Sequence, residues 1–123
     1  MTKAPTENSV LIIIPTLGQR EEYLRETIES IHKQSYKGFD IALIYPFGNH
    51  FVDTLADNIN AIKVPDPGGL SAALNAGIAA AKPHHKFISW IGDDDLLTPD
   101  SLKYSVDALN RYRHSPVAFG YFD

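Results

Sequence analysis

The fold is decided by a short apolar stretch near the start of the chain, VLIII at residues 10–14, which ends at Pro15. A continuous run of mostly β-branched residues is typical of a strand that is buried on both faces. Such strands belong to parallel sheets, because helices cover these sheets on both sides. We therefore predict an α/β protein in which residues 10–14 form a strand of a mostly parallel sheet.

Outward from this strand, helix and strand patterns alternate along the chain. Apolar residues at helical spacing predict helices over residues 19–34 and 70–81, a weaker one over 52–57, and a last one that Thr98 caps, with Pro99 in its first position. Further strands are predicted at residues 39–45, 60–64, 86–91 and 116–122. Alternating strands and helices imply right-handed βαβ units, so the predicted architecture is a three-layer αβα sandwich.

Length and composition narrow the function classes. The chain has 123 residues, which suits one domain, and we assign residues 1–9 to a flexible N-terminus and residues 10–123 to the domain. Eleven Lys and Arg against 15 Asp and Glu give a formal charge of −4 without a basic run, which argues against nucleic acid as a partner. The absence of cysteine excludes disulfides and thiolate metal sites. The five histidines lack metal-pair spacing and are interpreted as surface residues.

The N-terminal residues bear on location. Residues 1–9 are polar and lack the apolar core of a signal peptide, and no apolar run approaches the ~20 residues of a membrane span. We expect a cytoplasmic protein, and a longer form of it could lie at the inner face of a membrane. The oligomeric state stays open, and a homo-oligomer is compatible with the sequence.

Three consecutive aspartates, Asp93, Asp94 and Asp95, follow the predicted strand at residues 86–91. Ligands of α/β sheets bind at this edge, beyond the carboxyl ends of the strands. Adjacent carboxylates repel one another unless a cation offsets their charge, and no Lys or Arg stands beside them in the sequence. Mg²⁺ and Mn²⁺ prefer oxygen ligands, so we interpret the run as a metal site. The alternative is a solvated acidic turn that helps to cap the next helix.

Three parts of the sequence carry a family resemblance together. They are VLIIIPT at residues 10–16 with YLRETIESI at 23–31, GLSAALNAGI at 69–78, and WIGDDDLLTP at 90–99. In this order and spacing they resemble family 2 glycosyltransferases, which have the GT-A nucleotide-diphospho-sugar fold. The resemblance covers nearly the whole chain and implies a Rossmann-like, nucleotide-binding half of that fold.

The resemblance also implies roles for single residues. The acidic run corresponds to the DXD-type motif of the family, so Asp94 is expected to contact a divalent metal, Mn²⁺ or Mg²⁺, with Asp95 as a support or second ligand. The expected donor nucleotide-binding residues are Pro15, Thr16, Leu17, Tyr45, Gly69, Asn75 and Asp93. Among these, Asp93 is the expected ribose partner.

The sequence departs from the family pattern at three places. The acid pair that usually follows the second strand is absent, since residues 44–48 read IYPFG. Base recognition is therefore expected to use stacking on Tyr45 or to differ altogether from the family pattern. Leu74 stands where an arginine often precedes the asparagine of the second segment, and Gly92 stands where many members carry the first acid of the metal motif. Neutralisation of the diphosphate is therefore expected to depend on the metal.

By resemblance, the predicted activity is an inverting, metal-dependent transfer of a hexosyl or related sugar from a nucleoside diphosphate. The acceptor is a hydroxyl of a glycan, a lipid-linked molecule or another compound. The catalytic general base is expected beyond residue 123, so this chain would supply the donor and metal site. The alternative is a catalytically silent nucleotide-sugar-binding domain, or a fragment that lacks the acceptor half. The sugar, the base and the acceptor stay open.

Overall fold

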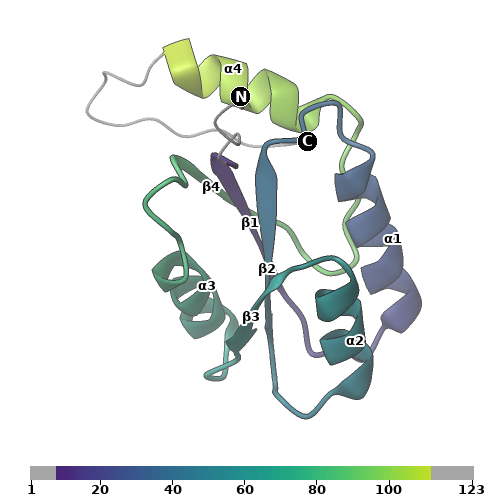
Figure 1. The fold of residues 1–123 in the computed structure, drawn as a ribbon. Coiled ribbons are helices and arrows are strands. Elements are labelled where there is room, and N and C mark those ends of the chain that lie inside the picture. Colours follow the sequence, from purple (N-terminus) through teal and green to yellow (C-terminus); the bar gives the residue numbers. More distant parts are fainter. Residues whose placement is uncertain (1–7, 112–123) are drawn as a thin grey trace.

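The computed structural model describes residues 8–111, in which strands and helices alternate as predicted. The elements are β1 (Val10–Pro15), α1 (Glu21–His32), β2 (Phe39–Tyr45), α2 (His50–Asn58), β3 (Ile62–Pro65), α3 (Leu70–Ala79), β4 (Phe87–Trp90) and α4 (Ser101–Arg111). Figure 1 shows their arrangement. The strand predicted at residues 116–122 and most of the N-terminal segment at residues 1–9 lie outside the described residues.

The described strands form one parallel sheet in the order β3-β2-β1-β4. β1 pairs with β2 on one side, where Val10 is opposite Phe39, and with β4 on the other, where Val10 is opposite Phe87. The chain moves outward from β1 to β3 and then returns across β1 to form β4. The strand order therefore reverses between β1 and β4, and ligands of such sheets bind beyond the carboxyl ends of the strands at this point.

Both faces of the sheet are covered, which confirms the three-layer architecture. In β1, Ile12 belongs to a core cluster with apolar residues of α1, α2 and α4, whereas Ile13 belongs to a second cluster with Ala73 of α3. Figure 1 shows α3 alone on its side of the sheet. The side chains of residues 10–14 are all buried because their alternating directions point into these two clusters.

Helix α3 packs close to the sheet through a glycine. A Cβ atom added at Gly77 would lie 2.6 Å from Cγ2 of Ile13, which is too short for a real contact. This agrees with the small residues that the sequence places on one ridge of this helix. No helix in the described part of the chain is long and apolar enough to cross a membrane.

Helix α4 begins two residues later than predicted, at Ser101 instead of Pro99. The carbonyl of Pro99 accepts a hydrogen bond from the backbone of Ser35, which holds Pro99 outside the helix. The side chain of Thr98 bonds to the hydroxyl of Ser101, while the backbone N–H of Leu102 donates to the side chain of Gln34. The predicted cap at Thr98 was therefore wrong, because the side chain of Gln34, two residues after α1, takes its place.

Candidate functional site

A cleft of about 350 Å³ lies at the carboxyl edge of the sheet, beside the point where the strand order reverses. Its volume is at the lower end of the range of roughly 300–1,000 Å³ that is common for small-molecule sites. Its lining residues are Pro15, Thr16, Leu17, Gln19, Arg20, Asp66, Gly69, Leu70, Ala73 and Asp93. The structure thus brings together five predicted donor-site residues from three separate parts of the chain: Pro15, Thr16, Leu17, Gly69 and Asp93.

A hydrogen-bonded link joins the ends of β1 and β4 in this cleft. The backbone N–H of Thr16 donates to the carbonyl of Ile44, which fixes Thr16 at the end of β1. Its hydroxyl then donates to Oδ2 of Asp93 at 2.7 Å and accepts from the N–H of Gly18 at 3.0 Å. Gly18 has a φ of 71°, and a Cβ there would lie 2.2 Å from Nδ2 of Asn49, so this turn requires glycine. The link places the Asp93 carboxylate within the cleft.

Two of the three aspartates converge on one cation. The guanidinium of Arg20 donates to Oδ1 of Asp93 at 3.1 Å and to Oδ2 of Asp94 at 3.0 Å. The sequence shows no basic neighbour because Arg20 precedes Asp93 by 73 residues; the sheet brings their two loops to the same edge. The guanidinium shows that one oxygen of each aspartate can bind the same cation. Carboxylate oxygens are the ligands that Mg²⁺ and Mn²⁺ prefer, so Asp93 and Asp94 are suitable ligands for a divalent metal.

Asp95 points elsewhere. Its Oδ2 accepts a hydrogen bond from the backbone N–H of Gly92 at 3.1 Å, and its own N–H donates to the carbonyl of the same glycine. In the described part of the chain, no set of three acidic or histidine ligand atoms converges at this loop. Asp95 therefore closes the turn that presents Asp93 and Asp94, and it does not face the cation as Asp94 does.

Tyr45 and Asn75 do not line the cleft. The side chain of Tyr45 is fully buried, its hydroxyl donates to Asp53, and its ring centroid lies 5.4 Å from that of Phe47. Burial raises the pKa of Tyr45, and the hydrogen bond to Asp53 adds to this rise. The ring is not accessible to a nucleotide base. Asn75 is exposed and lines a separate groove of about 470 Å³ between α3 and β4, next to Trp90.

Sequence reasoning missed three polar residues of the cleft, Gln19, Arg20 and Asp66. Asp66 directly follows β3, where its backbone N–H donates to the carbonyl of Tyr45 and its carboxylate accepts from the N–H of Gly68. The signal for Arg20 and Asp66 was present in the sequence, because each charge follows a predicted strand. The carboxyl ends of parallel strands meet at one edge, so such charges come together there.

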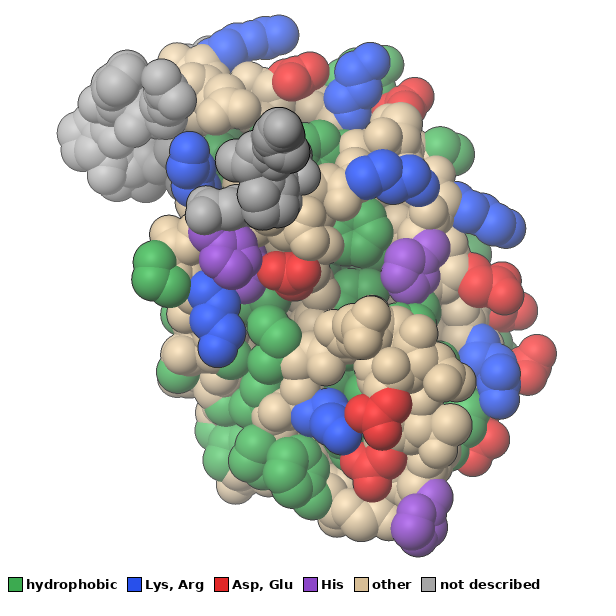
Figure 2. Space-filling model, viewed as in Figure 1, with side chains coloured by type: hydrophobic (Ala, Val, Ile, Leu, Met, Phe, Trp, Pro, Cys, Tyr) green, Lys and Arg blue, Asp and Glu red, His purple; other side chains and the backbone are tan. Residues whose placement is uncertain are grey.

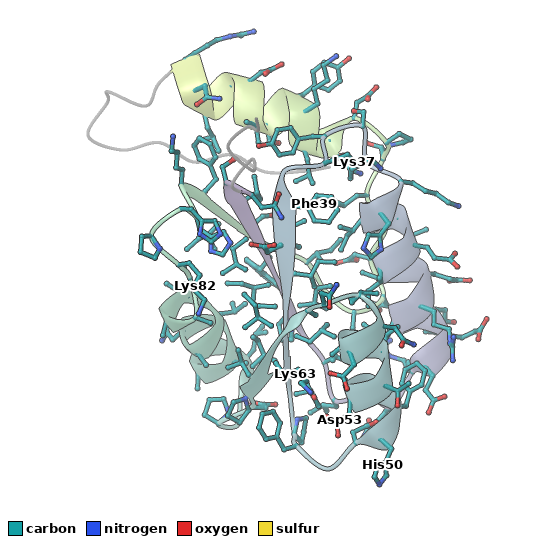
Figure 3. The ribbon with its side chains drawn as sticks, in the orientation of Figure 1. Lys37, Phe39, His50, Asp53, Lys63 and Lys82 are labelled. Atoms are coloured by element: carbon teal, nitrogen blue, oxygen red, sulfur yellow. The ribbon has the colours of Figure 1, made fainter. Side chains whose placement is uncertain are left out.

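A second polar cluster lies at the opposite, amino edge of the sheet, near Phe39 in Figure 3. Oδ2 of Asp40 lies 2.7 Å from Nε2 of His85 and 3.4 Å from Nε2 of His84, and the other Asp40 oxygen accepts from Asn8. Figure 2 shows histidine and acidic side chains meeting there. The side chain of His85 is fully buried, so its prediction as a surface residue was wrong.

Among the described residues, these three side chains are the group whose ligand atoms all lie within 4.8 Å of one another. Nδ1 of His85 accepts a hydrogen bond from the backbone N–H of Lys82, which makes Nε2 the protonated nitrogen of the neutral ring. A metal at Nε2 requires the opposite tautomer, with Nδ1 as the donor. We therefore interpret the cluster as a hydrogen-bonded clasp between β2 and the turn before β4.

Comparison with known proteins identifies the family. Residues 11–122 match the family model described as Glycosyl transferase family 2. An uncharacterized glycosyltransferase of Rickettsia prowazekii is 31% identical over 112 residues, which cover 88% of this chain and 34% of that protein. This chain therefore spans about a third of the length of that relative.

Solved structures share the fold. S. aureus TarS 1-349 in complex with UDP-GlcNAc superposes with a TM-score of 0.72 at 18% identity, covering 85% of this chain and 32% of that one. The mannosyltransferase PcManGT of Pyrobaculum calidifontis, in complex with GDP-Man and Mn2+, gives a TM-score of 0.67 at 19% identity, covering 85% and 33%. At these identities the likeness establishes the GT-A fold.

Proposed function

Because the chain belongs to glycosyl transferase family 2, we propose that its cleft binds the nucleoside-diphosphate sugar that serves as donor in glycosyl transfer. One observation carries the proposal. Asp93 and Asp94 converge on a single cation beside a cleft at the point where the strand order reverses, and Thr16 holds Asp93 in place. A solvated acidic turn needs neither the convergence nor the link to β1.

The cleft provides distinct surroundings for each part of the donor. Pro15 and Leu17 form an apolar wall for the base, and Asp66 supplies a carboxylate there in place of the acid pair that is absent after β2. Asp93 is the proposed partner of the ribose. The N-terminus of α3 at Gly69 lies at the cleft without a side-chain cap, and the helix has no acid in its first turn. Its backbone N–H groups suit a phosphate.

A divalent metal, Mn²⁺ or Mg²⁺, would be held by Asp94 together with Asp93 and the diphosphate. When bound, it stabilises the negative charge that develops on the departing diphosphate. Asp95 keeps the turn closed, as its contacts with Gly92 indicate. The chain's own contribution is therefore to orient the diphosphate and to hold two carboxylate oxygens toward it.

The proposal extends from donor binding to the transfer of the sugar to an acceptor. We infer an inverting reaction in which an acceptor hydroxyl displaces the nucleoside diphosphate, with an Asp or Glu outside this chain as general base. The relative from Rickettsia prowazekii, of which this chain covers 34%, has room for an acceptor half. A donor-binding domain without catalysis remains the second candidate, favoured by the observation that Asp93 and Asp94 are already engaged by Arg20.

Calorimetric titration with UDP, GDP, CDP and ADP, each with and without Mn²⁺, tests the donor site. We expect one nucleotide to bind, with an affinity at least about tenfold higher in Mn²⁺, because the metal bridges carboxylates and diphosphate. Asp94→Asn should remove this metal dependence. Asp95→Asn is the matched control, and it should keep most of the dependence. Metal-independent binding, or binding untouched by Asp94→Asn, contradicts the proposed role of Asp94.

A further inference from the structure

Arg20 occupies the position between Asp93 and Asp94 that a metal ion would take. We propose that Arg20 is a built-in counter-ion, which keeps the affinity for the metal low until a nucleoside diphosphate arrives and then transfers to that diphosphate. This inference rests on the proposed donor function of the same site. It adds to that function an exchange of cations that couples nucleotide binding to metal binding.

The contacts of Arg20 satisfy both carboxylates at once. Its two terminal nitrogens reach one oxygen of each aspartate at 3.0 and 3.1 Å. Asp93 also accepts from Thr16 through its other oxygen, so in this state both oxygens of this carboxylate have a partner. A metal ion could bind the same oxygens only if the guanidinium moved away, because two cations at this distance repel each other.

The guanidinium can be released at a small cost in free energy, because Arg20 itself is accessible to water. Arg20 is 52% exposed and Asp94 is 44% exposed, and a pair of this kind contributes little to stability. Asp93 is only 16% exposed, but its other oxygen keeps the hydrogen bond from Thr16. Arg20 is also the residue just before α1, where the chain is not yet helical. The guanidinium lies 5.8 Å from the ring centroid of Tyr23, a surface along which it can move without leaving the site.

Once released from the aspartates, the guanidinium of Arg20 can bind a diphosphate in the cleft. Arg20 is the one cationic side chain among the described residues that line the cleft. Arginine matches phosphate oxygens with two parallel hydrogen bonds, as it matches carboxylates. A diphosphate in the cleft therefore competes with Asp93 and Asp94 for Arg20, and the two freed carboxylates become available to the metal.

The exchange makes the two ligands cooperative. Each ligand removes an obstacle to the other, so the nucleotide raises the affinity for the metal, and the metal raises the affinity for the nucleotide by the same factor. Removing the guanidinium should weaken this coupling and have opposite effects on the two ligands taken singly. A residue that only stabilises the loop would weaken both.

The first part of the test is a titration of the chain with Mn²⁺ alone, in which electron paramagnetic resonance monitors the free ion. It measures whether Arg20 competes with the metal. We expect Arg20→Gln to bind Mn²⁺ about threefold to tenfold more tightly than the parent chain, because the guanidinium no longer competes with the metal for the two carboxylates. Arg25→Gln is the matched control. It removes the same charge from the same helix end, but Arg25 lies over the ring of Phe51 and forms no ion pair with Asp93 or Asp94. Its affinity for Mn²⁺ should stay within twofold of the parent.

The second arm repeats both titrations with the tightest-binding nucleoside diphosphate. Arg20→Gln should bind that nucleotide about fivefold more weakly and show a smaller enhancement by Mn²⁺, whereas Arg20→Lys, which keeps the charge, should lie between. Unchanged or weaker Mn²⁺ binding by Arg20→Gln overturns the exchange. If the parent chain binds no nucleotide, the donor function fails instead, and the Mn²⁺ arm still decides whether Arg20 competes with the metal.

Discussion

At the scale of single residues, Asp40 joins the amino end of β2 to the turn before β4. Burial alone would raise the pKa of Asp40, but hydrogen bonds from Asn8, His85 and His84 together lower it below its usual 3.8. A carboxylate with a lowered pKa stabilises the fold above the pKa of the unfolded chain. This stabilisation is lost as the pH falls through the lower, folded value.

Asp40→Asn should therefore destabilise the chain by about 1 kcal/mol at pH 5, a value reduced for the partial exposure of the carboxylate. The difference from the parent should shrink at about pH 3, where the parent begins to lose the same charge. Urea unfolding at the two pH values measures it, with the exposed Asp107→Asn as control. A difference that is the same at both values contradicts this account of Asp40.

Single residues also show where sequence reasoning succeeds. Pro15, Thr16 and Asp93 could be placed in the cleft because each lies at or just after the end of a predicted strand, and strand ends share an edge. Tyr45 also ends a strand, but its side chain follows the alternation of Leu43 into the core. Its position in the sequence does not reveal this direction, which depends on how the strand lies against α1 and α2.

At the scale of elements, α1 and α4 are held together by Gln34. This fully buried side chain donates to the carbonyl of Thr98 at 2.5 Å and accepts from the N–H of Leu102 at 2.9 Å. The backbone of Leu97 donates to Ser30 of α1, so the segment after the aspartates is attached to this helix at several points. The position of the acidic loop thus depends on the end of α1.

Gln34→Leu should destabilise the chain by about 1–3 kcal/mol, because it leaves the backbone N–H of Leu102 without its partner and removes one of the two hydrogen bonds to the carbonyl of Thr98. Thermal unfolding measures the loss, and amide exchange at Leu102 should become faster. Gln19→Leu provides a control at an exposed glutamine, and its unfolding temperature should change little. A Gln34→Leu chain as stable as the parent would show that these contacts do not hold α4.

The periodicity of the sequence predicted whether each described element is a helix or a strand. It did not always predict the residue at which an element begins or ends. Residues 10–14 and 39–45 could be predicted because apolar β-branched runs specify buried strands. The start of α4 could not, because it depends on contacts from residues 34 and 35, which are distant in the sequence. Helix caps supplied by another element leave no local pattern.

At the scale of the whole molecule, the proposed donor site depends on the strand order β3-β2-β1-β4. Alternation along the sequence predicts a parallel sheet, but it does not state that β4 lies beside β1. That neighbourhood brings Arg20 to Asp93 and Asp94 and separates this site from the clasp at the other end of the strands. We propose that a divalent metal binds at the carboxyl edge of the sheet.

Paramagnetic broadening of amide NMR signals by a small amount of Mn²⁺, added with a nucleoside diphosphate, shows at which edge of the sheet the metal binds. Binding at the carboxyl edge should broaden the signals of Gly92, Asp93, Asp94 and Gly18 first, while those of Asp40, His84 and His85 stay sharp. Broadening that begins at His84 and His85 would contradict it and place the metal at the amino edge instead.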